Sequence, residues 1–191
     1  MRTQNNINME LLRVVDKHGN NTNEILEREE LHNRNKLHNE VTIYIINNNN
    51  EVLLQRRSKN RRFSPDKLGV IAGHSLYNEN PIETAIREVK EEVGLKINKK
   101  DIHELLPKYL VIEEYNNHYM YPYYVISNLK EKDFSIQKEE LQYVKWYNID
   151  DIIDMINNNN QDIVFKKEEI QLFNKLKDIN LHKNKYNNEE K

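Results

Sequence analysis

The chain has 191 residues, of which 37% are hydrophobic and 31% charged, and it contains four glycines and no cysteine. A chain of this size can bury a core of its own, so we expect one soluble domain. The lack of cysteine excludes disulfide scaffolds, thiolate zinc sites, iron–sulfur clusters and cysteine nucleophiles. With 29 basic and 31 acidic residues the net charge is −2, which provides no overall attraction for nucleic acids or anionic membranes, and we expect neither as a partner.

Both ends of the chain are polar. Residues 1–8 lack the apolar core of a signal peptide, and no window approaches the roughly 20 apolar residues of a membrane span. We therefore expect disorder over residues 1–8, a folded domain over 9–182, a polar tail over 183–191 and a cytoplasmic location.

The first half of the domain has the residue pattern of β-strands. Glu10–Val15 is a short predicted strand that leads into a turn at Asp16–Asn20. Val41–Ile46 and Glu51–Leu54 are two strand-forming runs joined by Asn47–Asn50, which is typical of an antiparallel hairpin.

A helix with clear boundary signals follows. Asn80 can cap it, Pro81 suits its first position, Glu83 completes a capping box, and Gly94 supplies a left-handed stop. Five apolar side chains fall on one stripe that must face the core: Ile82, Ala85, Ile86, Val89 and Val93.

The remainder of the chain alternates strands and helices. Strands are predicted at Tyr109–Glu113, Tyr119–Ile126 and Tyr143–Tyr147, with Trp146 packed, and helices at Ile149–Ile156 and Lys166–Leu176. This order predicts an α/β fold of the α+β type, in which helices sandwich a mixed sheet.

Three glutamates project from the helix face opposite the apolar stripe. Glu88, Glu91 and Glu92 have the spacing i, i+3 and i+4, so their carboxylates converge and repel one another. Arg87 offsets only part of this repulsion. Either the face is solvated, or a hard divalent cation such as Mg²⁺ binds there and is completed by substrate phosphates.

The residues around this helix favour the cation. The pattern Gly73-x5-Glu79-x7-Arg87-Glu88-Val89-x-Glu91-Glu92-x-Gly94-Leu95 matches the Nudix box at every defining position, so residues 73–95 resemble those of the MutT-like Nudix hydrolase superfamily. The resemblance implies a Nudix α/β/α sandwich, here with a short N-terminal β extension.

The resemblance also implies roles for the matching residues. Glu88, Glu91 and Glu92 would hold Mg²⁺ or Mn²⁺, with a backbone carbonyl offered by Gly73. Arg87 would orient the glutamates and Glu79 would brace the loop. Glu79, Arg87, Glu91 and Glu92 are thus the candidate catalytic residues. In family members the metal bridges a diphosphate and positions a water for attack on phosphorus.

Residues upstream of the box are similar to a branch that includes the type 1 isopentenyl-diphosphate isomerases. They are Arg28-Glu29-Glu30, His38, Gln55-Arg56-Arg57-Ser58 and Ala72-Gly73-His74. In the isomerases a cysteine stands at the place of Ala72, and an acid precedes a later proline, where this chain has Asn117–Tyr121 before Pro122. Two missing catalytic groups argue against allylic proton transfer and favour hydrolysis.

The histidines leave two alternatives open. His38 and His74 align with isomerase metal ligands, which suggests a second metal site. Otherwise His38 bonds to a backbone group, and His74 lines the pocket as a neutral substrate-binding residue. His32 and His118 have less support for either role.

The basic run after the hairpin is a candidate phosphate site. It comprises Arg56, Arg57, Lys59, Arg61 and Arg62. We expect one or two of Arg56, Arg57 and Arg61 to contact substrate phosphate, with the rest solvated.

These observations predict a Mg²⁺-dependent Nudix hydrolase, with Mn²⁺ as a substitute, that cleaves a diphosphate linkage in a nucleoside diphosphate derivative or similar small metabolite. The alternatives are an isomerase acting on a prenyl diphosphate and a non-catalytic nucleotide-sensing module. A homodimer is left open. The substrate is also left open, since Tyr115, Tyr119, Tyr121 and Tyr123 suit either base stacking or a strand. The general base is open among Glu113, Glu114, Glu139 and Glu140.

Overall fold

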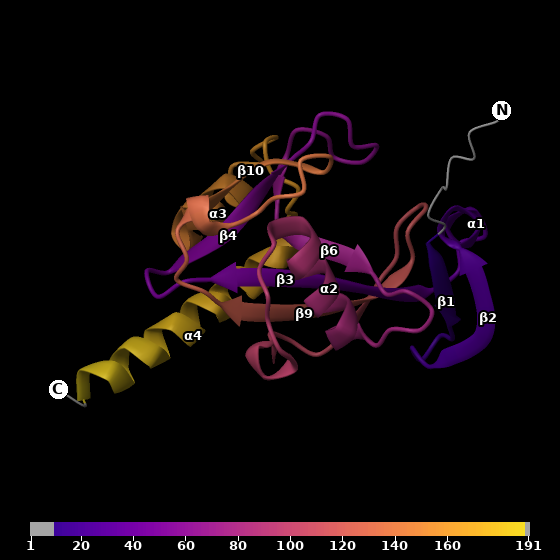
Figure 1. Ribbon diagram of the computed structural model, residues 1–191, viewed down its shortest axis with the longest axis horizontal. Helices are drawn as coiled ribbons and strands as arrows, with labels where there is room; N and C mark the ends of the chain where they lie inside the picture. The colour runs from indigo at the N-terminus through magenta and orange to yellow at the C-terminus, as the bar shows by residue number, and fades with distance from the viewer. Residues whose placement is uncertain (1–9, 190–191) are drawn as a thin grey trace.

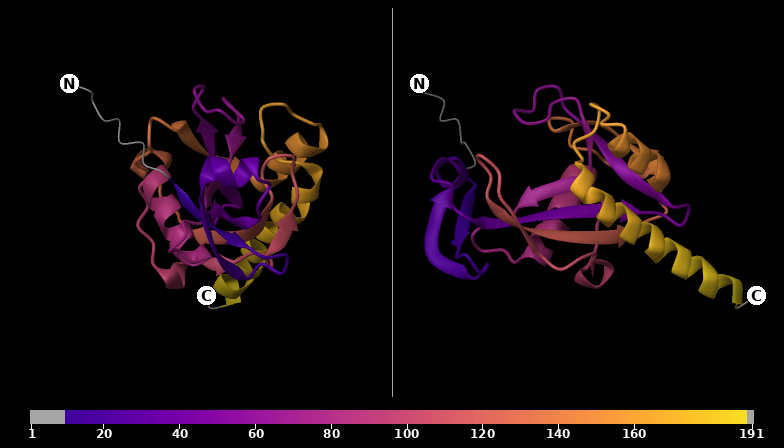
Figure 2. Two further views of the ribbon diagram at one scale, coloured as in Figure 1. Left: turned by 90° about the vertical axis from the view of Figure 1, so that its right-hand side faces the viewer. Right: turned by 180° about the vertical axis from the view of Figure 1, so that it is seen from behind.

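A computed structural model describes the backbone of residues 10–189 and the side chains of residues 10–179. The predicted disorder of residues 1–8 lies outside the described residues. Helix α2 (Pro81–Val93) covers one face of a mixed sheet, and helices α3 (Ile149–Asn157) and α4 (Ile170–Glu189) cover the other, as Figure 1 and Figure 2 show. The predicted α/β/α sandwich is confirmed.

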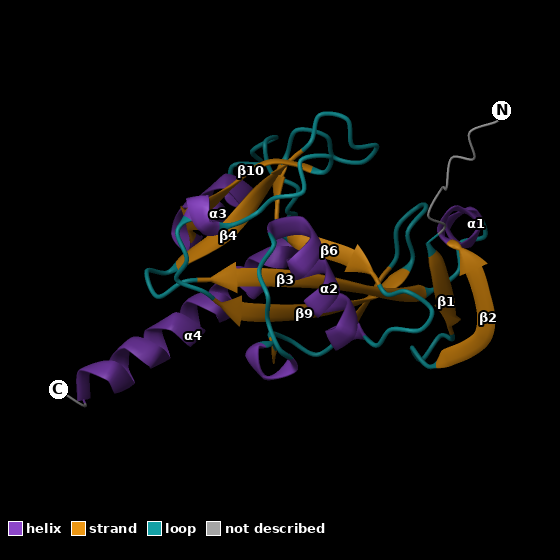
Figure 3. Ribbon diagram, viewed as in Figure 1, coloured by secondary structure: helices purple, strands orange, loops and turns teal. Residues whose placement is uncertain are grey.

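The main sheet has eight strands in the described chain. Its central path is β10 (Leu141–Asn148), β4 (Glu51–Arg57), β3 (His38–Ile46), β9 (His118–Ile126) and β7 (His103–Glu104), as in Figure 3. β3 and β9 run parallel over nine paired positions, from His38 with His118 to Ile46 with Ile126, while the other pairs are antiparallel. The register of β3 and β9 places their histidines side by side.

The predicted hairpin forms, but its two strands soon diverge. β3 and β4 pair at Ile46 and Val52, beyond which β6 (Ile71–His74) pairs with β3 and β5 (Leu68–Gly69) pairs with β4. The segment before α2 therefore lies directly beside β3, and it brings the glycine and histidine of β6 next to the start of that strand.

Alternate residues of β3 enter two separate cores. Val41, Ile43 and Ile45 pack with the predicted apolar stripe of α2, all five of whose residues belong to this core. Tyr44 and Ile46 pack on the other face with α3 and α4. This alternation fixes which side chains of β3 face α2.

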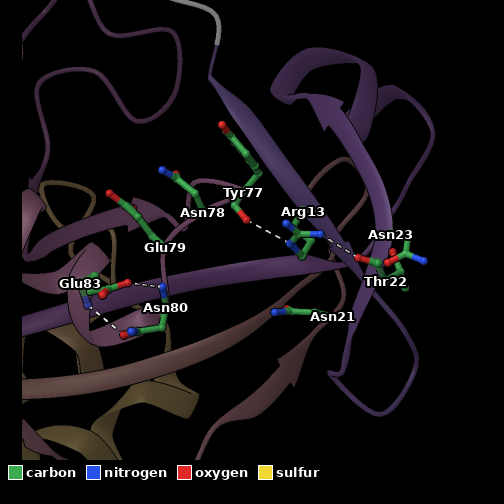
Figure 4. Close-up of a pocket in the computed structure, with 9 residues that line it drawn as sticks. All are labelled: Arg13, Asn21, Thr22, Asn23, Tyr77, Asn78, Glu79, Asn80 and Glu83. Atoms are coloured by element: carbon green, nitrogen blue, oxygen red, sulfur yellow. Dashed lines mark hydrogen bonds between the residues drawn. The ribbon is translucent and has the colours of Figure 1, made fainter.

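The boundaries of α2 are as predicted. The Asn80 side chain accepts hydrogen bonds from the N–H groups of Ile82 and Glu83, the Glu83 carboxylate accepts one from the Asn80 N–H, and Gly94 has φ 70°. Figure 4 shows this cap at the edge of an open polar pocket that Arg13 also lines. The cap fixes where the glutamates of α2 stand along the sheet.

An N-terminal unit that was predicted only in part lies at one end of the sheet. The expected first strand is β1 (Leu11–Val15), and it pairs with β2 (Asn21–Glu27), which leads into α1 (Arg28–Asn33). β2 is polar and α1 has no side-chain cap, so neither carries a clear sequence signal. Leu12, Val14 and Leu31 form their small core.

Several boundaries in the C-terminal half differ from the prediction. β8 (Tyr109–Val111) ends two residues earlier than expected, β10 begins two residues earlier, and α4 begins at Ile170 after a 3-10 turn at Lys167–Glu169. The backbone of α4 is helical up to Glu189, beyond the predicted helix end at Leu176. Trp146 is packed as predicted, with its ring against Phe134. None of the described helices has the length and apolarity that a membrane crossing requires.

Two further 3-10 turns complete the fold. They are η1 (Lys99–Asp101) and η2 (Glu131–Asp133), while η3 is the turn that precedes α4. Each lies in a connection between elements of the sandwich.

Phe173 provides a test of the packing. Its side chain is fully buried and meets the rings of Tyr44 and Phe165 edge to face. We expect Phe173→Ala to lower the free energy of unfolding by about 3–5 kcal/mol in urea titrations, because the change leaves a cavity. Phe63, which is 55% exposed, is the control, and Phe63→Ala should cost less than about 0.5 kcal/mol. Equal effects of the two changes would contradict the described core.

Candidate active site

Arg87 is the centre of a hydrogen-bond network in the middle of α2. Its Nε and Nη2 donate to the two oxygens of Glu79 at 2.8 and 3.0 Å. Its Nη1 donates to Glu88 Oε1 at 2.6 Å and to Glu91 Oε2 at 3.1 Å. Nη2 also donates to the main-chain oxygen of His74 at 3.0 Å. One guanidinium therefore holds three carboxylates and strand β6 together.

The opposite charges of Arg87 and Glu79 stabilise the ionised form of each other. Burial alone would raise the pKa of Glu79, but its bonds to Arg87 outweigh that effect and lower the pKa below its usual value. Burial acts to lower the pKa of Arg87, yet Glu79 and Glu88 raise it overall. Both partners are consequently charged throughout the neutral range.

Gly73 lies against Glu88. A Cβ atom added at Gly73 would stand 1.9 Å from Glu88 Oε1 and 2.1 Å from Cδ. Any side chain at this position would therefore displace the carboxylate from Arg87. Close approach of the carboxylate, rather than backbone conformation, explains why glycine is required here.

The three glutamates of α2 differ in exposure, which their helical spacing alone does not show. The Glu91 side chain is 52% exposed, but Glu88 is 13% exposed and Glu92 is buried. Glu92 lies toward β4, whose Gln55 and Arg57 are among the groups that shift its pKa, and the Gln137 N–H donates to the Glu92 carbonyl at 3.0 Å. A helical wheel cannot show which strand lies against a given residue of the helix.

The two covered carboxylates are costly to ionise. Burial, together with the charge of neighbouring glutamates, raises the pKa of Glu88 to about 7 and that of Glu92 to about 8. Glu92 Oε2 has no hydrogen-bond partner among the described residues. The Gln55 side chain nearby donates to the carbonyl of Val70 at 3.1 Å.

These residues suit a hard divalent cation. They provide carboxylate oxygens from Glu88, Glu91 and Glu92, one of them buried and unpartnered, and they lack sulfur and nitrogen donors. The carbonyl role expected of Gly73 remains a prediction, whereas its close approach to Glu88 is part of the described geometry.

The three candidate arginines have different surroundings. Arg56 is paired with Asp66 at 2.9 Å, and Arg61 is paired with Glu140 at 2.9 Å. Among the described residues Arg57 has no carboxylate at ion-pair distance, and its buried Nε lacks a partner. Burial lowers the pKa of Arg57, while Glu92 and Glu140 partly oppose this. Arg57 is thus the arginine most available to an anion beside Glu92.

A cluster of histidines lies beyond Gly73, on the other side of β6. Ligand atoms of His32, His38 and His74 all lie within 4.8 Å of one another. The His38 ring stacks on His74 with centroids 5.0 Å apart, and His118 lies 5.8 Å from His38. His32 and His118 therefore belong to the cluster, although the sequence offered them less support.

Burial favours the neutral form of His32, His38 and His74, and most of the ring nitrogens in the cluster are unpaired among the described residues. Burial lowers the pKa of His38 to about 3 and also lowers the pKa values of His32 and His74. Both ring nitrogens of His38 and the Nε2 atoms of His32, His74 and His118 lack partners in the described part of the chain. Neutral, unpaired imidazoles are the form that binds transition metals.

Glu40 is a carboxylate that the sequence reasoning missed. Its Oε2 lies 3.5 Å from His118 Nδ1 and 3.9 Å from His74 Nε2, and it accepts a hydrogen bond from Asn116 at 3.1 Å. It follows His38 by two residues on a strand, so the two-residue period places both on one face. That period could have identified Glu40 from the sequence.

Arg87 also provides a test of the described network. Replacing it with Met keeps much of its packing but leaves Glu79 and Glu88 without their donor, so we expect the free energy of unfolding to fall by about 2–4 kcal/mol. Lys177→Met, which removes an exposed partner of Asp150, should cost less than about 1 kcal/mol. Urea titration at neutral pH measures both, and a loss at Arg87 no larger than at Lys177 would refute the network.

Comparisons with known proteins agree with this geometry. The family model described as NUDIX domain matches residues 36–167. Isopentenyl-diphosphate Delta-isomerase 2 of Photorhabdus laumondii is 27% identical over 155 residues, covering 78% of this chain and 83% of that protein. The solved structure of DR0079 from Deinococcus radiodurans has a TM-score of 0.69 at 16% identity, covering 87% of this chain and 99% of that one. The MutT protein from Methanosarcina mazei has a TM-score of 0.58 at 20% identity, covering 75% of this chain and 95% of that one. At such identities the structures show the fold alone, but the family match spans most of the chain, which therefore belongs to the NUDIX family.

Proposed function

We propose that this chain is a Mg²⁺-dependent hydrolase that cleaves a diphosphate linkage in a nucleoside diphosphate derivative or similar small metabolite. The observation that carries the proposal is the set of three glutamates on α2. Arg87 orients two of them, and a buried oxygen of the third has no partner. Such an arrangement is unfavourable by itself and is stabilised by a cation.

Glu88, Glu91 and Glu92 would hold Mg²⁺, which when bound polarises the diphosphate and neutralises developing charge. Arg87 and Glu79 keep the carboxylates in one orientation before substrate arrives, so little reorganisation is needed during the reaction. Arg57 would bind a phosphate oxygen of the substrate, which supplies the partner that its Nε lacks.

Hydrolysis agrees better with the side chains than allylic isomerisation does. Isomerisation needs a proton donor and a proton acceptor around the double bond. On β6 the position before Gly73 is Ala72, which pairs with Thr42 in the sheet and carries no ionisable group. Glu40 pairs with His74 in the sheet, so the nearest carboxylate on β3 lies two positions from the partner of Ala72, and the position of Ala72 itself has no proton donor or acceptor.

We also propose a second metal site at the histidine cluster. His32, His38 and His74 would bind a borderline transition metal such as Zn²⁺ or Co²⁺ through nitrogen, with His118 or Glu40 available as a further ligand. Their nitrogen donors differ from the oxygen donors of the glutamates, so the two sites would select different metals.

A substrate panel tests the proposed activity. The panel contains nucleoside diphosphates, sugar nucleotides, dinucleotides, oxidised nucleotides and isopentenyl diphosphate, each with Mg²⁺. We expect phosphate or nucleotide release from at least one nucleotide. Proton exchange into isopentenyl diphosphate without hydrolysis would favour the isomerase, and no turnover at all would favour a sensing module.

Glu91→Gln tests the role of the glutamates. The change keeps the size of the side chain but removes a charge, and we expect turnover on the best diphosphate substrate to fall by about three decades or more. Lys90→Gln, at the exposed neighbouring position of the same helix, should stay within about threefold of the parent. Unchanged turnover of the Glu91 variant in a steady-state assay would contradict the assignment.

Co²⁺ provides a test of the second site that does not depend on activity. With excess Mg²⁺ present, we expect about one equivalent of Co²⁺ to bind and to give visible absorption bands of nitrogen-ligated Co²⁺. His38→Gln should abolish these bands and Glu91→Gln should preserve them. Bands that disappear in the Glu91 variant but persist in the His38 variant would show that the histidines are not the ligands.

A further inference from the structure

The proposed hydrolysis needs a group that accepts the proton of the attacking water, and the residues of the Nudix box leave this role unassigned. Any assignment of this role rests on the proposed hydrolysis. Four glutamates outside α2 are candidates, and their positions differ. Glu113 is paired with Lys166 at 2.7 Å, beside the turn that precedes α4. Glu114 and Glu139 are exposed. Glu140 is partly buried and stands at the start of β10.

The backbone holds Glu140 close to the helix glutamates. The Glu140 N–H donates to the carbonyl of Gln137 at 3.0 Å, and the Gln137 N–H donates to the carbonyl of Glu92 at 3.0 Å. On its other side, the Ser58 N–H donates to the Glu140 carbonyl at 2.6 Å. Glu140 is therefore fixed between α2 and the end of β4.

The side chain of Glu140 is oriented by a single cation. Arg61 Nη1 lies 2.9 Å from Glu140 Oε1, and the two side chains are 32% and 30% exposed. None of the described residues donates a hydrogen bond to the other oxygen. This carboxylate thus has one oxygen held and one free, and water can reach it, unlike the covered carboxylate of Glu92.

Charged groups of both signs face Glu140. Arg57 and Arg61 approach from β4 and the loop after it, and Glu88 and Glu92 approach from α2. The Glu140 charge is close enough to contribute to the raised pKa values of Glu88 and Glu92. The carboxylate therefore borders the space in which a diphosphate held by those glutamates would lie.

We propose that Glu140 is the catalytic residue that takes the proton from the attacking water, and that Arg61 is a positioning residue acting through it. The water oxygen forms a bond to phosphorus while the bond from phosphorus to the bridging oxygen breaks, and the leaving group departs with that electron pair. The water proton passes to the free oxygen of Glu140 and later to solvent. Arg61, one of the three arginines of which one or two were expected to bind phosphate, would therefore have a different role.

Glu140→Gln tests this role, with Glu139→Gln as the matched control at the exposed neighbour. On the substrate that the panel identifies, we expect kcat of the Glu140 variant to fall about 100-fold or more, the range of general-base contributions. KM and the Mn²⁺ dissociation constant from calorimetry should stay within about twofold of the parent values. The control should retain parental kcat.

Arg61→Gln tests the positioning role. Because Arg61 holds one oxygen of Glu140 in place, its loss should lower kcat about tenfold at an unchanged KM, and Arg61→Lys should restore part of the loss. Adding Arg61→Gln to Glu140→Gln should lower kcat little further. Circular dichroism and thermal melting check that each variant is folded.

Three outcomes would overturn the inference. Parental kcat in a folded Glu140→Gln variant would exclude the role directly. Weakened Mn²⁺ binding with kcat restored by excess metal would identify Glu140 as a ligand instead. No turnover by the parent chain across the panel would refute the proposed hydrolysis together with this role, whereas parental turnover with an unimpaired variant refutes this role alone.

Discussion

The bonds made by the guanidinium of Arg87 connect the fold of this protein to its proposed chemistry. They join the loop before α2 through Glu79, the helix through Glu88 and Glu91, and strand β6 through the carbonyl of His74. The glycine of β6 in turn permits Glu88 to approach that strand. Helix, loop and strand must all be in place before the carboxylates converge, so the site exists only in the folded domain.

The same β6 segment separates two groups of candidate metal ligands. Gly73 faces the carboxylates of α2, whereas His74 belongs to the histidine cluster. Successive residues of a strand point to opposite faces, so the two proposed sites, which differ in donor chemistry, would stand on the two sides of one strand. Oxygen donors favour Mg²⁺, and neutral imidazoles favour later transition metals.

The central helix was predictable in detail because its signals are local. The cap at Asn80, the stop at Gly94 and the apolar stripe depend on residues within a few positions of one another. The burial of Glu92 was not predictable, since it depends on the approach of β4, a strand far from α2 in the sequence. The histidine cluster was predicted in part, because its members come from α1, β3, β6 and β9, and the first of these elements is too short and weakly capped to recognise.

The central claim is that the glutamates of α2 form a divalent-cation site on which a diphosphate binds. Crystals soaked with Mn²⁺ and a non-hydrolysable imidodiphosphate test it most directly, by anomalous difference density. The account predicts a manganese peak bounded by Glu88, Glu91 and Glu92, with the diphosphate in contact with it. Density for the diphosphate elsewhere, or no manganese beside these three side chains, would contradict it.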